Sequence, residues 1–406
     1  MRKRFKFLLA SSSIGGLYIL FEYYIHKRRT KQIKEQKKVL SKSPSCGTLD
    51  RLKYDILIAE GIEKEDMLIT LKECFDVDNP EELSLETLTK VLHDNHPSKK
   101  DTIIDDFIHK PLPFTIQITM SIANWLTFKI LESNCNIDTY EGDCIIHSFF
   151  PKKNIRSDKY VKYKKTFILF AGLSGSVVQL FKLINILVKN DYDILLPMYG
   201  PGDLSLNHNL NHNQYDYCHE IIKFLLKQEI RNIHLFAWSL GGIKYLCFES
   251  LILKDKSLSS KIKIKTVHLF EPLLTSRAVI DMYFTSRRSI FRTIKIVNSR
   301  TRKNNFKYLL LNCIMGYFIH TVLGFGCANS TDYLYHTEHK HNNIVYPYER
   351  YLYISTNDFL FNDTADKHVI ENNFNKENVF SRIGYHGGWL RSSQLEKTFG
   401  SIISQN

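Results

Sequence analysis

Short apolar runs alternate with amphipathic segments along the second half of the chain. The segments VVQLFKLINILVKN (177–190) and CHEIIKFLLKQE (218–229) place apolar residues at the spacing of one helix face. Strand-like runs that alternate with such helices are typical of βαβ units. We therefore predict an α/β fold with a mostly parallel sheet flanked by helices, and the predicted strands are CIIHSFF (144–150), TFILFAG (166–172), YDILLP (192–197), NIHLFAW (232–238), IKTVHLF (264–270), YLYIS (351–355) and NVFSRI (378–383).

Two long segments depart from this alternation. Residues 41–139 have a helical pattern and include a charge-free run from Leu112 to Phe128. Membrane contact is one alternative for this run, but Thr, Gln, Ser and Asn interrupt it, so we expect a helix buried against the main body. Residues 275–344 interrupt the strands as an insertion. The predicted organisation is an N-terminal segment (1–40), a helical region (41–139), an α/β core in two parts (140–274 and 345–406) and a cap formed by the insertion.

The N-terminal segment combines an apolar run with dense positive charge. Phe7 to Ile25 contains 19 mostly apolar residues interrupted by Glu22, enough to cross a hydrocarbon core of about 30 Å as a helix. Four Lys and Arg residues precede the run, and seven follow it through Lys38. A signal peptide would have a cleavage site of small residues after the apolar run, whereas this chain has a dense basic stretch there. We predict an uncleaved single-pass anchor in a membrane such as the endoplasmic reticulum, and the charge difference favours a cytosolic body.

Most of the net positive charge belongs to this terminus. Residues 1–40 carry a net charge of +9 out of +13 for the whole chain, and the other 366 residues carry 44 bases and 40 acids. No zinc-finger, RNA-recognition or basic-zipper pattern accompanies the charge, so we expect no nucleic-acid partner. The eight cysteines are scattered without a CxxC pair, which is typical of buried, reduced thiols.

A serine lies between a predicted strand and a predicted helix, in the sequence AWSLGG (237–242). A nucleophile elbow needs this setting, because a sharp turn lifts the serine off the sheet edge and small neighbours let the two backbones approach closely. Measured against the pattern Gly-x-Ser-x-Gly, Ala237 replaces the first glycine, whereas Gly241 and Gly242 are kept. We predict that Ser239 is a nucleophile.

Three further segments supply the groups that a nucleophilic serine needs. Asp358 follows the predicted strand YLYIS, and His386 lies in a glycine-flanked loop past the last predicted strand. In TFILFAGLSGS, a turn after the strand could aim the backbone N–H of Leu173 at a developing oxyanion, with the N–H of Leu240 as the second donor. Each predicted group lies at the carboxyl end of a predicted strand, and these ends meet at one edge of a parallel sheet.

On these residues, the chain from 140 to 400 resembles an α/β-hydrolase. The runs FILFAGLSGS, YDILLPMYGPGDLS and NIHLFAWSLGG are similar to the oxyanion strand, second strand and elbow of membrane-anchored α/β-hydrolase-domain lipases and related serine esterases. The resemblance implies an ester hydrolase that uses Ser239, Asp358 and His386, in that order, through an acyl-enzyme and without a cofactor. The chain departs from the family pattern at Ala171, at Ala237 and in the segment YGPGD (199–203).

The insertion suggests the class of substrate. Tyr308 to Gly326 contains 19 residues without Lys, Arg, Asp or Glu, and a basic stretch precedes it. As the cap of a hydrolase, this segment would form an apolar lid suited to acyl chains and anionic head groups near a membrane surface. We therefore expect a lipid ester as the substrate.

Alternatives remain for the acid, for a metal and for the reaction. Glu271, at the end of the preceding strand, and Asp363 are other candidate acids, although role and order favour Asp358. An acyltransferase would use the same residues, and a non-catalytic membrane scaffold would keep the same fold. We predict no metal site, because loops rich in Asn and His supply ligand-like spacings freely, as they do at His208, His212, His336, His339 and His341.

Overall fold

The computed structural model describes the α/β core and parts of its surroundings. The described residues are 23–24, 27, 114–142, 144–152, 165–172, 176–198, 214–274, 346–356, 358, 374–384 and 386–405. The expected lid, residues 41–113 and the expected anchor apart from Tyr23 and Tyr24 lie outside them.

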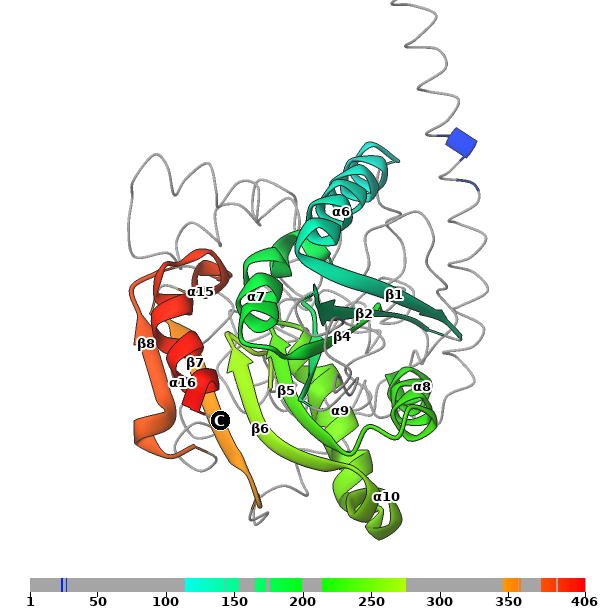
Figure 1. The fold of residues 1–406 in the computed structure, drawn as a ribbon. Helices are drawn as coiled ribbons and strands as arrows, with labels where there is room; N and C mark the ends of the chain where they lie inside the picture. Colours follow the sequence, from blue (N-terminus) through cyan, green and yellow to red (C-terminus); the bar gives the residue numbers. More distant parts are fainter. Residues whose placement is uncertain are drawn as a thin grey trace, which may run out of the picture.

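An eight-stranded sheet forms the centre of the described part, in the order β1-β2-β4-β3-β5-β6-β7-β8 (Figure 1). Strand β2 runs antiparallel to both neighbours, β1 and β4, and all the other pairs are parallel. The mostly parallel sheet confirms the α/β prediction. The strands are β1 (Cys135–Glu141), β2 (Ile145–Pro151), β3 (Thr166–Phe170), β4 (Asp193–Met198), β5 (Asn232–Trp238), β6 (Lys263–Phe270), β7 (Glu349–Ser355) and β8 (Val379–Arg382).

Helices cover both faces of this sheet. Helices α7, α15 and α16 lie on one side, and α8, α9 and α10 lie on the other (Figure 1). A further helix, α6, packs on α7 and leads into β1. The helices are α6 (Phe114–Asn134), α7 (Val177–Lys189), α8 (Gln214–Lys227), α9 (Gly241–Lys254), α10 (Lys256–Lys261), α15 (Gly388–Arg391) and α16 (Gly400–Gln405), with short turns at Lys376–Asn378 and Leu395–Phe399.

The central strands divide their side chains between two cores. In β3, Phe167 and Leu169 belong to the core under α7, whereas Ile168 and Phe170 belong to the core under α8 and α9. Successive strand residues point to opposite faces, so a strand covered on both faces must be apolar throughout. Burial of each large apolar side chain contributes roughly 1.5–3 kcal/mol. This two-sided burial holds the parallel strands, and therefore their carboxyl ends, in place.

The four described cysteines agree with the sequence prediction. Cys135, Cys144, Cys218 and Cys247 are buried thiols that form no disulfide. Burial raises the pKa of the Cys135 thiol to about 11, so that this group stays protonated at neutral pH.

Strand β1 corrects the sequence analysis, which predicted a helical pattern up to residue 139. Cys135–Glu141 instead pairs antiparallel with β2 along its whole length. This strand lies at the edge of the sheet, and its residues are mostly half-buried or exposed. An edge strand lacks the continuous apolar run of a buried one, which explains why its pattern was missed.

Helix α6 is only partly buried, in contrast to the prediction of a helix buried against the body. Leu131 and the polar residues Asn124 and Thr127 are buried. Asn124 accepts a hydrogen bond of 2.7 Å from the Ser176 hydroxyl at the start of α7. The solvent-facing side exposes a row of large apolar side chains, namely Ile118, Ile122, Trp125, Leu126 and Ile130.

Within the described part of the chain, no helix has both the length and the apolar character needed to span a membrane. The predicted anchor, Phe7 to Ile25, lies almost wholly outside that part.

Candidate active site

Ser239 occupies a sharp turn between β5 and α9. Its backbone φ is 52°, in the left-handed region that non-glycine residues seldom adopt. A Cβ on Gly241 would lie 2.0 Å from the carbonyl oxygen of Phe170, and one on Gly242 would lie 2.7 Å from that of Leu273. The two glycines are therefore required because neighbouring backbone passes close to the start of α9.

Ala237 fits the position where the elbow pattern has glycine. Ala237 is fully buried in the core under α8 and α9. In the sheet it pairs with Phe170 on one side and with Leu269 on the other. The methyl group therefore points into an apolar core, which explains how the chain accepts alanine here.

Ser239, His386 and Asp358 are joined by two hydrogen bonds. The Oγ atom of Ser239 lies 2.7 Å from Nε2 of His386, and Nδ1 of His386 lies 2.7 Å from Oδ2 of Asp358. A carboxylate only accepts, so Nδ1–H donates to Asp358 and Nε2 is left to accept from the serine hydroxyl. All three residues are buried. The structure thus brings together the three residues that the sequence analysis selected.

The sheet explains how residues so far apart in the sequence meet. Ser239, Asp358 and His386 follow the carboxyl ends of β5, β7 and β8, which belong to one parallel set. Asp358 is held in a turn by the hydrogen bond of 3.0 Å from its N–H to the carbonyl of Ser355. His386 precedes Gly387, whose φ of 77° permits the turn into α15.

Glu271 is the second carboxylate at this site. It directly follows β6 and has a φ of 44°, and its side chain accepts hydrogen bonds from the Ser355 hydroxyl and from the backbone N–H of Gly387. The imidazole of His386 hydrogen-bonds Asp358 instead. The geometry therefore favours Asp358 over Glu271 as the acid partner of the histidine. The other alternative, Asp363, lies outside the described residues.

The charges at the site alter the pKa of His386. Burial alone lowers the pKa of this imidazole, but the nearby carboxylates of Asp358 and Glu271 raise it, and the net shift is upward from 6.5. Burial, together with the charge of Asp358, raises the pKa of Glu271 to about 7. The site therefore contains an imidazole made more basic by its neighbours, as a general base requires.

The oxyanion donors are only partly described. Leu240 directly precedes α9 and is buried, and N–H groups at a helix start have no acceptor within the helix. Leu173 lies outside the described residues. The preceding Gly172 lies beside the nucleophile, since a Cβ there would be 3.1 Å from Cβ of Ser239. The end of β3 is therefore adjacent to the serine.

Two residues that touch the site were not selected from the sequence. Trp238 stacks against the imidazole of His386, and Ser355 hydrogen-bonds Glu271. Trp238 sits next to Ser239 inside the elbow, so a bulky aromatic residue in the motif was the available signal. Ser355 carried no signal, because a serine at the end of a strand is common.

Among the described residues, one group has the composition of a metal site. Oxygen atoms of Glu271 and Asp358 and a ring nitrogen of His386 lie within 4.8 Å of one another. Both ring nitrogens of His386 already form hydrogen bonds, to Ser239 and to Asp358, so this arrangement suits proton transfer. The histidines considered as ligands from the sequence lie outside the described residues.

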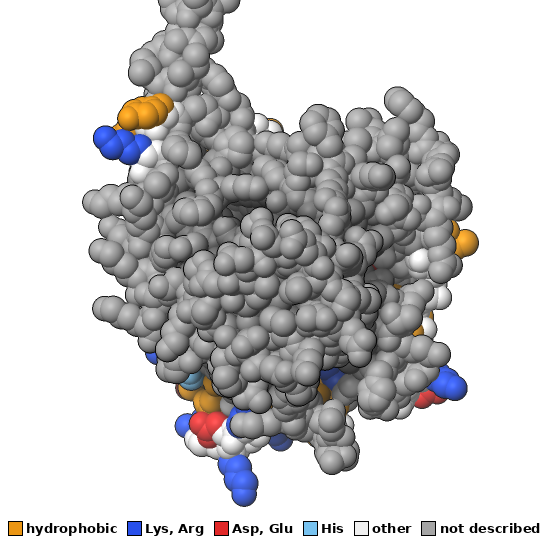
Figure 2. Space-filling model, turned by 180° about the vertical axis from the view of Figure 1, so that it is seen from behind, with side chains coloured by type: hydrophobic (Ala, Val, Ile, Leu, Met, Phe, Trp, Pro, Cys, Tyr) orange, Lys and Arg blue, Asp and Glu red, His pale blue; other side chains and the backbone are white. Residues whose placement is uncertain are grey.

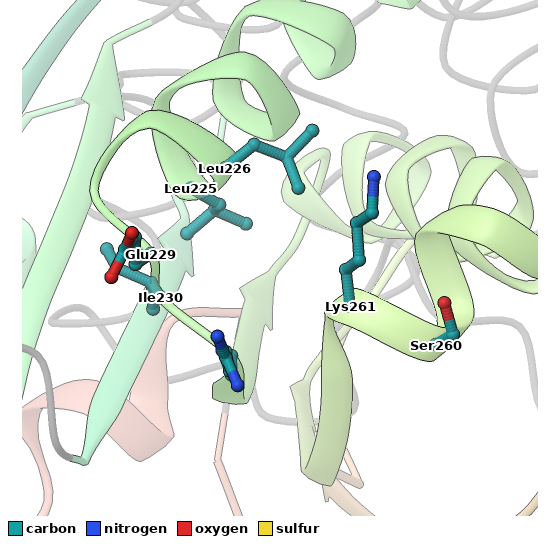
Figure 3. A pocket seen from close by; sticks show the side chains of 7 residues that line it. Leu225, Leu226, Glu229, Ile230, Ser260 and Lys261 are labelled. Carbon is teal, nitrogen blue, oxygen red and sulfur yellow. The ribbon is translucent and has the colours of Figure 1, made fainter.

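A surface pocket of about 340 Å³ lies away from this site (Figure 3). Arg231 and Lys261 line it and precede β5 and β6, so the pocket lies at the amino ends of these strands, whereas Ser239 follows the carboxyl end of β5. In the view from behind, some of the charged side chains of the described residues are visible at the lower edge of the molecule (Figure 2). The pocket is therefore separate from the triad residues.

Comparison with known proteins gives likeness in structure only. No protein-family model matches the chain, and no curated protein matches it. Solved structures with similar coordinates include naproxen esterase from Bacillus subtilis, with 10% identity, a TM-score of 0.42 and coverage of 71% of this chain and 98% of the esterase. A soluble variant of monoglyceride lipase from Saccharomyces cerevisiae has 11% identity, a TM-score of 0.43 and coverage of 66% and 93%. The haloalkane dehalogenase DatA from Agrobacterium tumefaciens has 11% identity, a TM-score of 0.44 and coverage of 67% and 97%.

The fold assignment rests on this chain's own architecture. Its sheet is parallel from β4 through β8 with an antiparallel β2, and Ser239 lies in a strained strand-turn-helix junction. The acid and the histidine follow later strands in the order Ser239, Asp358, His386. These features together give the chain the α/β-hydrolase fold.

Proposed function

We propose that this protein is a serine hydrolase that cleaves carboxylic esters. The observation that carries the proposal is the buried hydrogen-bond chain from Ser239 through His386 to Asp358. A serine hydroxyl is a weak nucleophile unless a base within hydrogen-bond reach accepts its proton. His386 is such a base, and Asp358 holds the tautomer in which Nε2 is free of hydrogen.

The reaction runs in two stages. Ser239 Oγ attacks the acyl carbon while its proton passes to Nε2 of His386, and the carbonyl oxygen becomes an oxyanion bound by the N–H of Leu240 and, as the second donor, that of Leu173. Collapse of this intermediate breaks the ester bond, and His386 gives the proton to the leaving alcohol. Water then attacks the acyl-enzyme with His386 again as base, which releases the acid and restores Ser239.

The charge distribution supports this use of the site. Proton transfer to His386 creates an imidazolium, and the carboxylates of Asp358 and Glu271 favour that charged form, as the raised pKa of His386 indicates. Burial of the groups strengthens these interactions, because the surrounding dielectric is low. The site is thus arranged to stabilise the charge that develops in the transition state.

The proposal includes a lipid ester as substrate and a membrane as the place of action. The apolar run Tyr308 to Gly326 and the basic-flanked run Phe7 to Ile25 support it from the sequence. The exposed apolar side of α6, which includes Trp125 and Ile122, supports it as well, because burying such side chains at the boundary between lipid and water lowers the free energy. The N-terminal run is the proposed single-pass anchor, with the hydrolase body in the cytosol.

Covalent labelling with a fluorophosphonate tests the enzyme assignment before any substrate is known. We expect the wild-type protein to be labelled and Ser239→Ala to be unlabelled while it keeps its thermal unfolding transition. Ser250→Ala is a matched control, because Ser250 is also buried but lies in the third turn of α9, and it should be labelled like the wild type. An unlabelled wild-type protein would indicate a non-catalytic scaffold. If Ser239→Ala were labelled as strongly as the wild type, the nucleophile would be a residue other than Ser239.

A further inference from the structure

Glu271, directly after β6, is held by hydrogen bonds to two other segments, β7 and the loop that contains His386. Its residue is 1% exposed. Its backbone N–H donates to the carbonyl of Tyr353 in β7 at 2.8 Å, and its carboxylate accepts from Ser355 and from Gly387. A buried carboxylate is costly unless its oxygens are hydrogen-bonded, so both accepted bonds are needed to keep it in this place.

One of these bonds acts on the histidine loop. Gly387 follows His386 directly, and its N–H donates to Oε2 of Glu271 at 2.5 Å. The loop turns sharply here, since Gly387 has a φ of 77°. A bond to the next peptide group therefore limits how far the Cα of His386 can move, and with it the imidazole.

The carboxylate also lies close enough to the imidazole to affect its charge. Oxygens of Glu271 and Asp358 and a ring nitrogen of His386 lie within 4.8 Å of one another. At such distances in a buried site, an opposite charge stabilises the protonated imidazole. Burial, and in addition the charge of Asp358, raises the pKa of Glu271 to about 7, so the charge that this carboxyl presents to the imidazole depends on pH near neutrality.

We propose, on the basis of the hydrolase function above, that Glu271 is a positioning residue of the catalytic site: it fixes the His386 loop through the Gly387 amide, and its carboxylate places a second negative charge beside the imidazole. Asp358 remains the partner that hydrogen-bonds Nδ1. Glu271 acts through the loop and through its charge and does not touch the reacting atoms. The arrangement supplies two carboxylates to one histidine, each with a different task.

Among the described residues, a further charged group near this network is Arg382 in β8. Its guanidinium donates to the carbonyl of Gly388, and a Cβ on Gly388 would lie 3.2 Å from the same guanidinium and 3.5 Å from Oγ of Ser355. In the described part of the chain, the groups that act on the Glu271 carboxylate are the Ser355 hydroxyl, the Gly387 amide, the His386 imidazole and the carboxylate of Asp358. Arg382 supports the same loop one residue farther on.

Two substitutions at Glu271 separate the two tasks. In Glu271→Gln, the amide oxygen can still accept from Gly387 and the amide NH₂ can donate to Ser355, so the loop stays bonded and only the charge is lost. In Glu271→Ala, both the bonds and the charge are lost. Glu249→Gln is the matched control, because Glu249 is also a fully buried carboxylate with hydroxyl partners but belongs to the core side of α9.

The first test is the titration of His386, which needs no turnover. Histidine-selective NMR of the full chain should show a lower pKa for His386 in Glu271→Gln than in the wild type, and no change in Glu249→Gln. The acid limb of the fluorophosphonate labelling rate should move to lower pH in the same variant. An unchanged pKa of His386 in Glu271→Gln would overturn the electrostatic part of the proposal, whether or not the protein proves to be a hydrolase.

The second test concerns position. We expect Glu271→Ala to lose kcat by on the order of 10- to 100-fold with little change in KM, since small displacements of catalytic groups cost that much, and Glu271→Gln to lose less. Equal kcat values in the wild type and in folded Glu271→Ala would overturn the positioning role. If Glu271→Ala does not fold, Ser355→Ala, which removes one bond to the carboxylate, replaces it and should give a smaller loss of the same kind. If the hydrolase assignment itself were wrong, the fluorophosphonate would not label the wild-type protein, and this result separates that failure from a failure of the role proposed for Glu271.

Discussion

The indole of Trp238 stacks on the imidazole of His386, with ring centroids 6.0 Å apart and an angle of 22° between the planes. Trp238 is the last residue of β5 and directly precedes Ser239. The same short segment therefore places the serine and supports one face of its base. A Cβ on Gly387 would lie 3.3 Å from Cζ2 of this indole, so the histidine loop and the tryptophan also limit each other's position.

Asp358→Asn should lower kcat by about 10³-fold or more, because an amide in this position no longer holds the imidazole in the tautomer with a free Nε2. Thermal unfolding should show a folded protein, and a steady-state assay with an activated ester measures the loss. Near-normal turnover of Asp358→Asn, together with an inactive Glu271→Gln, would assign the acid to the end of β6.

The pH dependence of kcat/KM should follow His386. Burial lowers its pKa, but the charges of Asp358 and Glu271 more than offset that effect, so the pKa lies above 6.5. The base works in its neutral form, so kcat/KM should fall as pH decreases through a midpoint above 6.5. The same shift affects folding stability. Because the pKa of His386 is higher in the folded state than in the unfolded state, its contribution to the free energy of unfolding is present at low pH and is lost as the pH rises through the pKa of the folded state. A midpoint at or below 6.5 would contradict the assignment.

Gly241→Ala should prevent stable folding or cost on the order of 3 kcal/mol or more, since the added Cβ would lie 2.0 Å from a backbone carbonyl oxygen. Gly400→Ala serves as the comparison, because a Cβ there meets nothing closer than 3.9 Å and alanine favours helix. Urea unfolding measures both variants. Equal free energies of unfolding for the two variants would show that the backbone at the start of α9 does not pass as close to the Phe170 carbonyl as the structure indicates.

Deletion of residues 1–38 should release the protein from membranes. These residues hold the run Phe7 to Ile25 and a net charge of +9, and they contain none of the triad residues. Flotation with vesicles and fractionation of cells measure the partition. If high salt alone releases the intact chain, the attraction is electrostatic and the run does not span the bilayer.

Activity should rise with the length of the acyl chain and with the presence of a lipid interface. Each buried CH₂ group contributes about 0.8 kcal/mol, so a long acyl chain gains several kcal/mol more than acetate against an apolar wall. Polar substitutions at Leu310, Ile314 and Phe318, spaced four apart, should flatten this dependence. A purified enzyme that prefers acetate esters and does not respond to vesicles would exclude the lipid substrate.

Local pattern in the sequence was enough to predict the α/β class, most strand positions and the three residues that hydrogen bonds join in the structure, Ser239, His386 and Asp358. A buried parallel strand is apolar along its whole length, so the burial of Phe167 can be predicted from the run around it. A nucleophile elbow needs small residues beside the serine, so the roles of Gly241 and Gly242 can be predicted as well. Both signals depend on neighbours within a few positions. The chain order of Ser239, Asp358 and His386 then restricted their arrangement to one sheet edge.

The tertiary structure decided what depends on pairing between distant segments. It joined β1 to β2 as an antiparallel edge strand, left one side of α6 exposed, and gave the imidazole bond to Asp358 while directing Glu271 to the Gly387 amide. Two carboxylates that follow neighbouring strands look equivalent in sequence, because no local pattern encodes which oxygen lies within hydrogen-bond distance of a loop more than a hundred residues away. Only the packing of β6, β7 and the histidine loop against one another sets that distance.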